Sequence, residues 1–151
     1  MLELARSGDL EAVNALAMQV HELHVHWRPD LFESQEELYS EERFRKALQQ
    51  RQLYVARLDT AVVGYALLLT ETMERPGMRT RKVMIVDEFC VHESCRGHGI
   101  GKAMMEDIHA LAKAFRCSDL QLKVYPQNDD AVGFYQQCGF QIQKIGMQKK
   151  V

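Results

Sequence analysis

Hydrophobic and polar positions follow two different spacings along this chain. Between residues 9 and 27, apolar side chains recur every three or four positions, which is typical of one face of a helix. Residues 53–58 and 62–71 are instead rich in β-branched and apolar side chains and flank Asp59-Thr60, the pattern of a strand hairpin. The same reasoning predicts strands at 2–5, 53–58, 62–71, 81–91, 120–124 and 140–149, and helices at 9–27, 36–50, 100–115 and 129–138.

Proline and glycine mark the boundaries between these elements. Pro29 ends the first helix, because the residue before a proline avoids helical geometry. Pro76-Gly77 places an exposed loop at 74–80, and Pro126 ends a strand shortly before the last helix. The order β-α-α-β-β-β-α-β-α-β predicts a mixed sheet covered by helices, not an all-parallel doubly wound sheet. No repeat, low-complexity segment or linker divides residues 1–151, so a single domain is expected.

Composition limits the classes of partner. The chain has 46% apolar and 26% charged residues, which is ordinary for a soluble globular protein. Nineteen basic residues against 21 acidic ones give a formal charge of -2, so no general attraction to nucleic acid or to an anionic membrane is expected. No apolar stretch approaches the roughly 20 residues that span a bilayer. The four cysteines form no C-x-x-C pair and the first residues do not resemble a signal peptide, which predicts a reduced, cytoplasmic protein, with disulfides as the alternative.

The segment Arg-Gly-His-Gly-Ile-Gly-Lys at 96–102 is the most informative pattern in the chain. A glycine-rich turn that enters a helix can hold phosphate groups, because the backbone approaches the ligand closely and the first helical N–H groups are unpaired. The segment is not a P-loop, since Arg96 stands where the first glycine belongs and Ala103 replaces the hydroxyl residue. A dinucleotide fingerprint would need glycine in place of Lys102. An ordinary glycine turn remains the alternative.

A second pattern follows about thirty residues later. The motif N-x-x-A-x-x-F-Y-x-x-x-G-F comprises Asn128, Ala131, Phe134, Tyr135, Gly139 and Phe140. Together with R-x-x-G-x-G at 96–101, it resembles the GNAT superfamily of N-acetyltransferases, and the resemblance covers residues 87–140. It implies an α/β (α+β) fold with a mixed, mostly antiparallel sheet of about six to seven strands, about four flanking helices and a splayed pair of parallel strands.

The resemblance also implies a cofactor and its site. GNAT proteins bind acetyl-CoA, a co-substrate, in the opening between two neighbouring parallel strands, here 83–91 and 120–124. By that similarity, backbone groups of residues 89–91 contact the pantetheine arm, residues 96–102 hold the pyrophosphate and Tyr135 reaches the sulfur. The expected cofactor-binding residues are Phe89, Cys90, Val91, Arg96, Gly97, His98, Gly99, Ile100, Gly101, Lys102, Asn128 and Tyr135.

Acetyl transfer to an amine requires an acid, a base and donors for the oxyanion. An alkylamine has a pKa near 10, like lysine, so a proton must be removed before or during attack. Tyr135 is the expected acid for the departing thiolate, and a core aromatic beside Phe134 is the alternative. Many family members place a glutamate five positions before the motif asparagine, where this chain has Lys123. Glu88, and after it Asp87, are therefore the candidate bases, with ordinary charged strand residues as the alternative.

The acceptor is expected to enter beside the first two helices, their connection and the loop at 72–80. His24 and Trp27 are the candidate substrate contacts there, although a packed or surface position is the commoner reason for such histidines. His21-Glu22-Leu23-His24 is not H-E-x-x-H, so no metal site is expected. The glutamates between residues 33 and 42 attract a cationic amine or form a solvated helix face.

The resemblance to GNAT proteins implies an enzyme that moves an acetyl group from acetyl-CoA to a primary amine of a small molecule or peptide, by direct attack and without a metal. The expected partner is that amine, not nucleic acid or membrane. GNAT proteins often form homodimers, but no residue pattern in this chain decides the oligomeric state. A non-catalytic acyl-CoA-binding module of the same fold is the alternative, because Lys123 stands where an acid is usual. A nucleotide-phosphate enzyme is a second rival.

Overall fold

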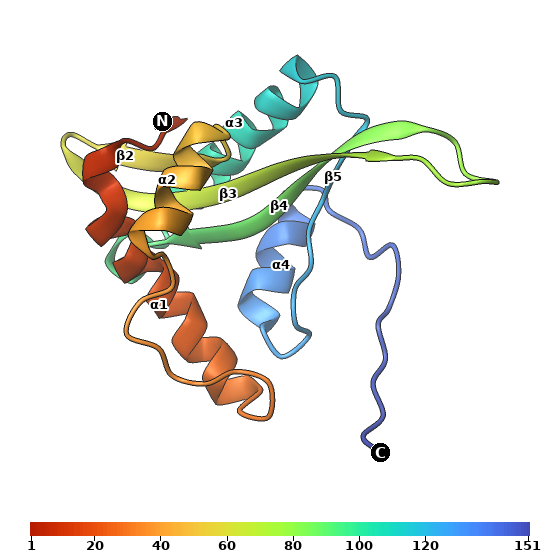
Figure 1. Cartoon of the computed structure of the whole chain (residues 1–151), viewed down its shortest axis with the longest axis horizontal. Helices are drawn as coiled ribbons and strands as arrows, with labels where there is room; N and C mark the ends of the chain where they lie inside the picture. Colours follow the sequence, from red (N-terminus) through yellow and green to blue (C-terminus); the bar gives the residue numbers. More distant parts are fainter.

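A five-stranded sheet runs through the centre of the molecule, with helices on both faces (Figure 1). The computed structural model describes residues 1–151. The strands are β1 (Leu2–Leu4), β2 (Leu53–Leu58), β3 (Ala61–Met73), β4 (Arg81–Val91) and β5 (Asp119–Gln121), in the order β1-β2-β3-β4-β5. The helices are α1 (Leu10–Trp27), α2 (Glu41–Gln49), α3 (Ile100–Ala114) and α4 (Asp129–Gln137), with short 3₁₀ turns η1 (Ser7–Asp9) and η2 (Glu93–Cys95). The predicted mixed, mostly antiparallel sheet is confirmed, since only β4 and β5 are parallel.

Alternation along the strands divides the core between two helical layers. Leu53 and Val55 of β2 pack in a buried cluster with α1 and α2. Tyr54, which lies between them, packs in a second cluster with α3 and with Tyr135 of α4. Successive strand residues point to opposite faces, so α1 and α2 cover one face of the sheet while α3 and α4 cover the other. No helix combines the length and apolar character that a membrane crossing requires.

The second helix is shorter than its sequence pattern predicts. It was expected at 36–50, but α2 begins at Glu41, where the Ser40 hydroxyl caps it by accepting from the Arg43 N–H. Residues before the cap are held in an irregular path by α1. The Asn14 side chain accepts from the backbone of residues 38 and 39 and donates to the carbonyl of residue 39. This contact between distant segments outweighs the local preference for helix.

The parallel pair β4 and β5 separates after a short stretch of pairing. Strand β4 has the predicted bounds, whereas β5 covers Asp119–Gln121 instead of residues 120–124. The last paired residues are Ile85 and Gln121, after which β4 continues to Val91 while the other segment turns toward α4 (Figure 1). Residues 86–91 therefore have no strand neighbour on this edge, as expected for a splayed pair.

The predicted final strand at 140–149 does not form, which leaves five strands instead of six or seven. After Phe140, whose N–H donates to the Tyr135 carbonyl, the chain runs away from the sheet (Figure 1). Near its end, Gln148 accepts from Arg28 at 2.6 Å, which draws the segment toward the connection between α1 and α2. An alternating pattern forms a strand only when another backbone segment lies beside it as a hydrogen-bonding partner. Here the segment runs past the edge of the sheet without pairing with it.

Candidate functional site

The turn that follows β4 leads into α3 and leaves backbone donors unpaired. The first hydrogen bond of α3 runs from the Ala103 N–H to the Gly99 carbonyl, so the N–H groups of residues 100–102 have no acceptor within the helix. Arg96, at the start of the turn, donates its Nε–H to the Val91 carbonyl at 3.1 Å. The turn thus places free donors and positive charge beside the end of β4, an arrangement that binds anions.

The three glycines of this turn are needed for two different reasons. Gly97 and Gly99 have φ of 78° and 80°, in the left-handed region that favours glycine. A Cβ atom on either would meet nothing within 4 Å, so the outer side of the turn is open. A Cβ atom on Gly101 would instead lie 3.2 Å from the Phe134 ring, so this glycine lets α3 approach α4. Lys102 follows on the exposed side of the helix.

Aromatic rings connect this turn to β4 and α4. Phe134 stacks on Tyr135 with ring centroids 5.5 Å apart, and Phe89 of β4 packs against Tyr135 at 6.2 Å in an edge-on arrangement. Three of the predicted site segments are thereby brought together, namely residues 89–91, the turn at 96–102 and Tyr135.

The Tyr135 side chain has two features that bear on its predicted role. Its ring packs as a core aromatic would, and burial raises the pKa of Tyr135 to about 12, with smaller contributions from Cys90 and Cys138. The phenol therefore remains protonated at neutral pH and can donate a hydrogen bond. Tyr135 can therefore be both a core aromatic residue and the predicted acid.

An extra residue in β4 determines how the two candidate bases, Glu88 and Asp87, are oriented. In the ladder with β3, Leu67 lies opposite Glu88 but Leu68 lies opposite Val86, which leaves Asp87 as a β-bulge. Val86 packs against the α3 side of the sheet, whereas Glu88 contacts side chains of the α1 and α2 side. Asp87 is exposed. The candidate bases therefore occupy different surroundings.

Glu88 is the centre of a hydrogen-bonded cluster. One carboxylate oxygen accepts from the Tyr39 hydroxyl at 2.6 Å and from the Tyr65 hydroxyl at 2.9 Å, and the other accepts from Arg43 at 2.8 Å. The Arg43 guanidinium also lies 3.9 Å from the centroid of the Tyr39 ring. Burial, and secondarily the charge of Glu88, raises the pKa of both Tyr39 and Tyr65 far above that of free tyrosine. Both phenols therefore act as permanent donors to the carboxylate.

The residues around Glu88 were not predicted from the sequence. Tyr39 and Tyr65 are 0% and 2% exposed, and a buried tyrosine needs a partner for its hydroxyl. The position of Tyr65 in a buried strand was therefore a usable signal. Tyr39 and Arg43 carried no such signal, because their segment reaches β4 only through the tertiary fold.

Asn128 has a structural function in addition to its predicted contact with the cofactor. Its side-chain oxygen accepts from the Ala131 N–H at 3.2 Å and so caps α4. Its backbone N–H donates to the Tyr125 carbonyl, which closes the turn between β5 and α4. On the opposite side of β4, Gln19 of α1 donates to the Cys90 sulfur at 3.4 Å.

His24 and Trp27 lie in an aromatic cluster at the end of α1. The His24 ring is 5.1 Å from Phe32 and 5.5 Å from Tyr125, measured between centroids, and Trp27 is 6.1 Å away. Burial, followed by the nearby His21 charge, lowers the pKa of His24. The cluster joins α1 to the β5–α4 turn, and no contact links it to Glu88. No group of metal-ligating side chains gathers in the structure.

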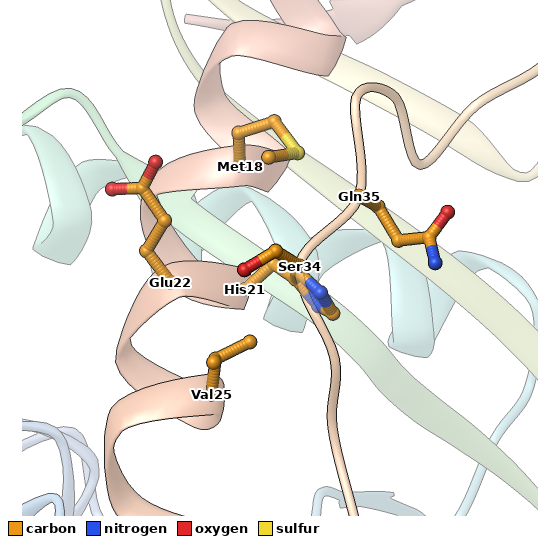
Figure 2. Close-up of a pocket in the computed structure, with 6 residues that line it drawn as sticks. All are labelled: Met18, His21, Glu22, Val25, Ser34 and Gln35. Carbon is orange, nitrogen blue, oxygen red and sulfur yellow. The ribbon is translucent and has the colours of Figure 1, made fainter. Parts of the chain in front are cut away.

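A cavity of about 150 Å³ lies elsewhere, between α1 and the connection that follows it (Figure 2). Its lining comprises Met18, His21, Glu22, Val25, Ser34 and Gln35. His21 is held by the Glu33 carbonyl at 2.6 Å. At 3.6 residues per turn, His21 and Val25 project roughly 120–160° around the helix from Gln19, which contacts β4. The cavity therefore does not face the splayed strands.

Comparison with known proteins gives one broad match and several structural ones. A sequence profile described as the acetyltransferase (GNAT) family matches residues 18–140. The crystal structure of a mutant BH1408 protein from Bacillus halodurans has a TM-score of 0.95 at 32% identity, covering 100% of this chain and 99% of that one. Aminoglycoside N-acetyltransferase AAC(6')-Iy, in complex with CoA, has a TM-score of 0.74 at 16% identity, covering 99% of this chain and 93% of its own, which shows similarity of fold.

A shorter match involves a protein named as a polyamine acetyltransferase. Spermine/spermidine N(1)-acetyltransferase of Bacillus subtilis (strain 168) is 35% identical over 57 residues. The aligned segment covers 37% of this chain and 38% of that enzyme, well under half of its length.

Proposed function

Because the chain belongs to the acetyltransferase (GNAT) family, we propose that it transfers the acetyl group of acetyl-CoA to a primary amine of a small molecule or peptide. The proposal rests mainly on one observation. The edge of β4 from residue 86 to residue 91 is unpaired, and it lies between a helix start with free N–H groups and a protonated phenol. A phosphate-bearing thioester needs all three: donors for its diphosphate, a free strand edge for its amide arm and a donor beside its sulfur.

The turn at 96–102 is suited to the diphosphate of the cofactor. Gly97 and Gly99 leave the outer side of the turn open, so main-chain donors are accessible to a bulky anion. Arg96 and Lys102 add positive charge, while residues 89–91 offer backbone groups to the pantetheine arm. Acetyl-CoA supplies an acyl group already activated as a thioester.

At the reacting end, the chain's own groups stabilise charge. A β4 backbone N–H in the unpaired stretch is the proposed donor to the oxyanion, an interaction commonly worth a few kcal/mol. Tyr135 donates its phenolic hydrogen to the departing sulfur. Its raised pKa of about 12 keeps it in the donor form across the working range of pH.

Glu88 is the proposed group for the amine's proton. Its carboxylate already accepts from two phenols and one guanidinium, which orients it and fixes its negative charge on the α1 and α2 side of β4. The Arg43 side chain is 44% exposed, so an incoming cation can compete for the oxygen it occupies. Asp87, exposed on the bulge, is the second candidate.

The proposed acceptor class is a cationic amine of the polyamine kind. The partial similarity to an enzyme named for spermine and spermidine supports this class. So do the connection between α1 and α2 and the first turn of α2, where Glu33, Glu36, Glu37, Glu41 and Glu42 all lie within ten residues. The aromatic rings around His24 and Trp27 add faces that attract ammonium groups.

Release of free CoA thiol, measured across a panel of amines, tests the proposal. Turnover with any amine supports an enzyme. Tight binding of acetyl-CoA with no turnover on any acceptor would favour the non-catalytic acyl-CoA-binding module. A thermal-shift series with acetyl-CoA, ATP and NAD separates the nucleotide-phosphate rival, because only a ligand of the native state raises the melting temperature. Stabilisation by ATP or NAD in preference to acetyl-CoA would reject the proposal.

A further inference from the structure

A second cavity, of about 220 Å³, lies on the α3 side of the sheet, beside the C-terminal end of that helix. Tyr54, Leu68 and Met84, from three neighbouring strands, line it from the sheet. Phe115, the residue that ends α3, lines it from the helix. Because α3 has 15 residues, its two ends are roughly 22 Å apart. The cavity is therefore separate from the turn at 96–102, where α3 begins.

Three polar side chains at this cavity have no hydrogen-bond or ion-pair partner in the chain. Tyr54 is only 7% exposed, yet its hydroxyl makes no hydrogen bond, although a buried tyrosine hydroxyl usually finds a partner. No unpartnered side-chain oxygen or nitrogen is sealed from solvent, so this hydroxyl opens into the cavity that the residue lines. The Arg51 guanidinium and the Thr70 hydroxyl, also in the lining, are unpaired too. A ligand would supply the missing acceptors.

The charges around the cavity favour an anion. No acidic residue lines it. Burial raises the pKa of Tyr54, and the nearby Arg51 charge partly opposes that rise, so the two groups act on each other. The Lys82 ammonium lies 5.8 Å from the centroid of the Phe115 ring and adds positive charge on the helix side. A guanidinium and a phenol can donate together to the oxygens of one carboxylate, whereas the guanidinium would repel a cation.

The volume and the apolar lining limit the rest of the ligand. At about 30 Å³ for each molecule of liquid water, the cavity could hold roughly seven waters. It is smaller than the roughly 300–1,000 Å³ of sites for drug-sized ligands, so its ligand must be small. Leu68, Met84 and Phe115 offer apolar surface to such a ligand. Burial against these side chains favours an apolar or aromatic body over a bare inorganic anion.

We propose that this cavity is a second ligand site, which binds a small carboxylate with an apolar or aromatic body. The carboxylate accepts from Arg51 and Tyr54, while the body packs against the apolar side chains of the sheet and of Phe115. The site does not depend on acetyl transfer, because it shares no residue with the proposed acetyl-transfer site.

The backbone at Arg51 provides a variant that loses the guanidinium without strain. Arg51 follows α2 with φ of 55°, in the left-handed region that favours glycine. Arg51→Gly should therefore fold at least as well as the wild type. Arg116, which follows α3 with φ of 59°, is also exposed and unpaired but does not line the cavity. Arg116→Gly makes the same change of charge and backbone strain and is the matched control.

Benzoate, which joins one aromatic ring to a carboxylate, is the probe, and benzamide is its neutral analogue. Titration of the full chain, followed by NMR of isotope-labelled methionine methyl groups, gives the Kd of each. The wild type should bind benzoate at least about tenfold more tightly than benzamide. Arg51→Gly and Tyr54→Phe should each weaken benzoate binding by about tenfold, the loss of one charge-assisted hydrogen bond. Arg116→Gly should change the Kd by less than about twofold in 0.15 M salt, which screens exposed charges beyond about 8 Å.

The methionine signals also locate the bound probe. Met84 lines the proposed site, whereas Met18 lines the cavity between α1 and the connection that follows it. Benzoate should shift the Met84 methyl signal and leave that of Met18 in place. An unmoved Met84 signal would show that benzoate is an adventitious additive only, bound elsewhere or not at all. Equal affinity for benzamide, or an unchanged Kd in Arg51→Gly or in Tyr54→Phe, would likewise overturn the proposal. None of these measurements requires acetyl-CoA or turnover.

Discussion

Replacing Tyr135 by phenylalanine removes one oxygen and preserves the ring's packing against Phe89 and Phe134. Burial raises the pKa of Tyr135 to about 12, whereas a thiol has a reference pKa of about 8.5, so complete proton transfer to the thiolate is uphill by roughly 5 kcal/mol. The hydroxyl is therefore expected to act by hydrogen bonding to developing negative charge. Such a bond contributes about 1.5–3 kcal/mol. The corresponding fall in kcat is about 10- to 160-fold.

The assay separates the chemical step from binding of the cofactor. Release of CoA thiol gives kcat and KM for the amine, with a blank for the chain's own cysteines, and calorimetry gives the Kd of acetyl-CoA. Tyr135→Phe should lower kcat and leave that Kd within about twofold, because the bond strengthens only as the sulfur gains charge. Tyr54→Phe, which removes a hydroxyl from the α3 side of β2, is the matched control and should leave kcat unchanged.

Two results would refute this reasoning. An unchanged kcat in Tyr135→Phe would remove the residue as a donor to the leaving group. A Kd for acetyl-CoA that weakens by the same factor as kcat/KM would show that the hydroxyl contributes uniform binding, not stabilisation of the transition state.

Three further predictions concern the turn, the buried phenols and the base. Gly99→Ala should lower the free energy of unfolding by about 1–2 kcal/mol, because alanine is strained at a φ of 80°. Gly133→Ala, in α4 with open space around it, should instead raise the free energy of unfolding by about 0.5–1 kcal/mol. Urea unfolding of both variants compares the two effects. Tyr39 and Tyr65 have a higher pKa in the folded state than in the unfolded state, where the pKa of tyrosine is about 10. The free energy of unfolding should therefore fall as the pH rises past that value, and urea midpoints from pH 8 to 11 measure this. If Glu88 accepts the amine's proton, Glu88→Gln should lower kcat in the CoA-thiol assay, because the amide cannot take up that proton; an unchanged kcat argues for another base.

Elements whose pattern is local were predictable from the sequence, and elements that depend on a distant partner were not. Strand β4 has its predicted bounds, because a segment rich in β-branched and apolar residues is bounded by polar turns on both sides. The start of α2 was wrong by five residues, since Asn14 on another helix holds the preceding segment in an irregular path. The strand expected at 140–149 does not form for the same kind of reason: its alternation is present, but none of its backbone groups pairs with a neighbouring strand.

The candidate site shows the same division. The turn at 96–102 was identified from its glycine pattern and the motif around Tyr135 from its resemblance to GNAT proteins, and the fold brings both to the end of β4. The partners of Glu88 could not be identified in this way, because Tyr39 and Arg43 come from a connection and a helix about 45 residues earlier in the chain. Local sequence motifs therefore predict the backbone groups of a site more completely than they predict the distant side chains that the fold brings to it.

The bulge at Asp87 connects these observations, because it determines on which face each neighbouring residue acts. In a regular strand Val86 and Glu88 would point to the same side. The extra residue reverses the alternation, so Val86 packs toward α3 while Glu88 reaches Tyr39 on the opposite face. Phe89, the next residue, then returns to the face that carries Tyr135. The proposed base and the proposed acid therefore approach from opposite faces of the sheet, beside the stretch where β5 has left β4. A variant that deletes Asp87 would make Val86 and Glu88 adjacent in a regular strand, which keeps Glu88 on the face of Tyr39. Release of CoA thiol should therefore continue in this variant if Glu88 is the base, and it should be lost if Asp87 is the base.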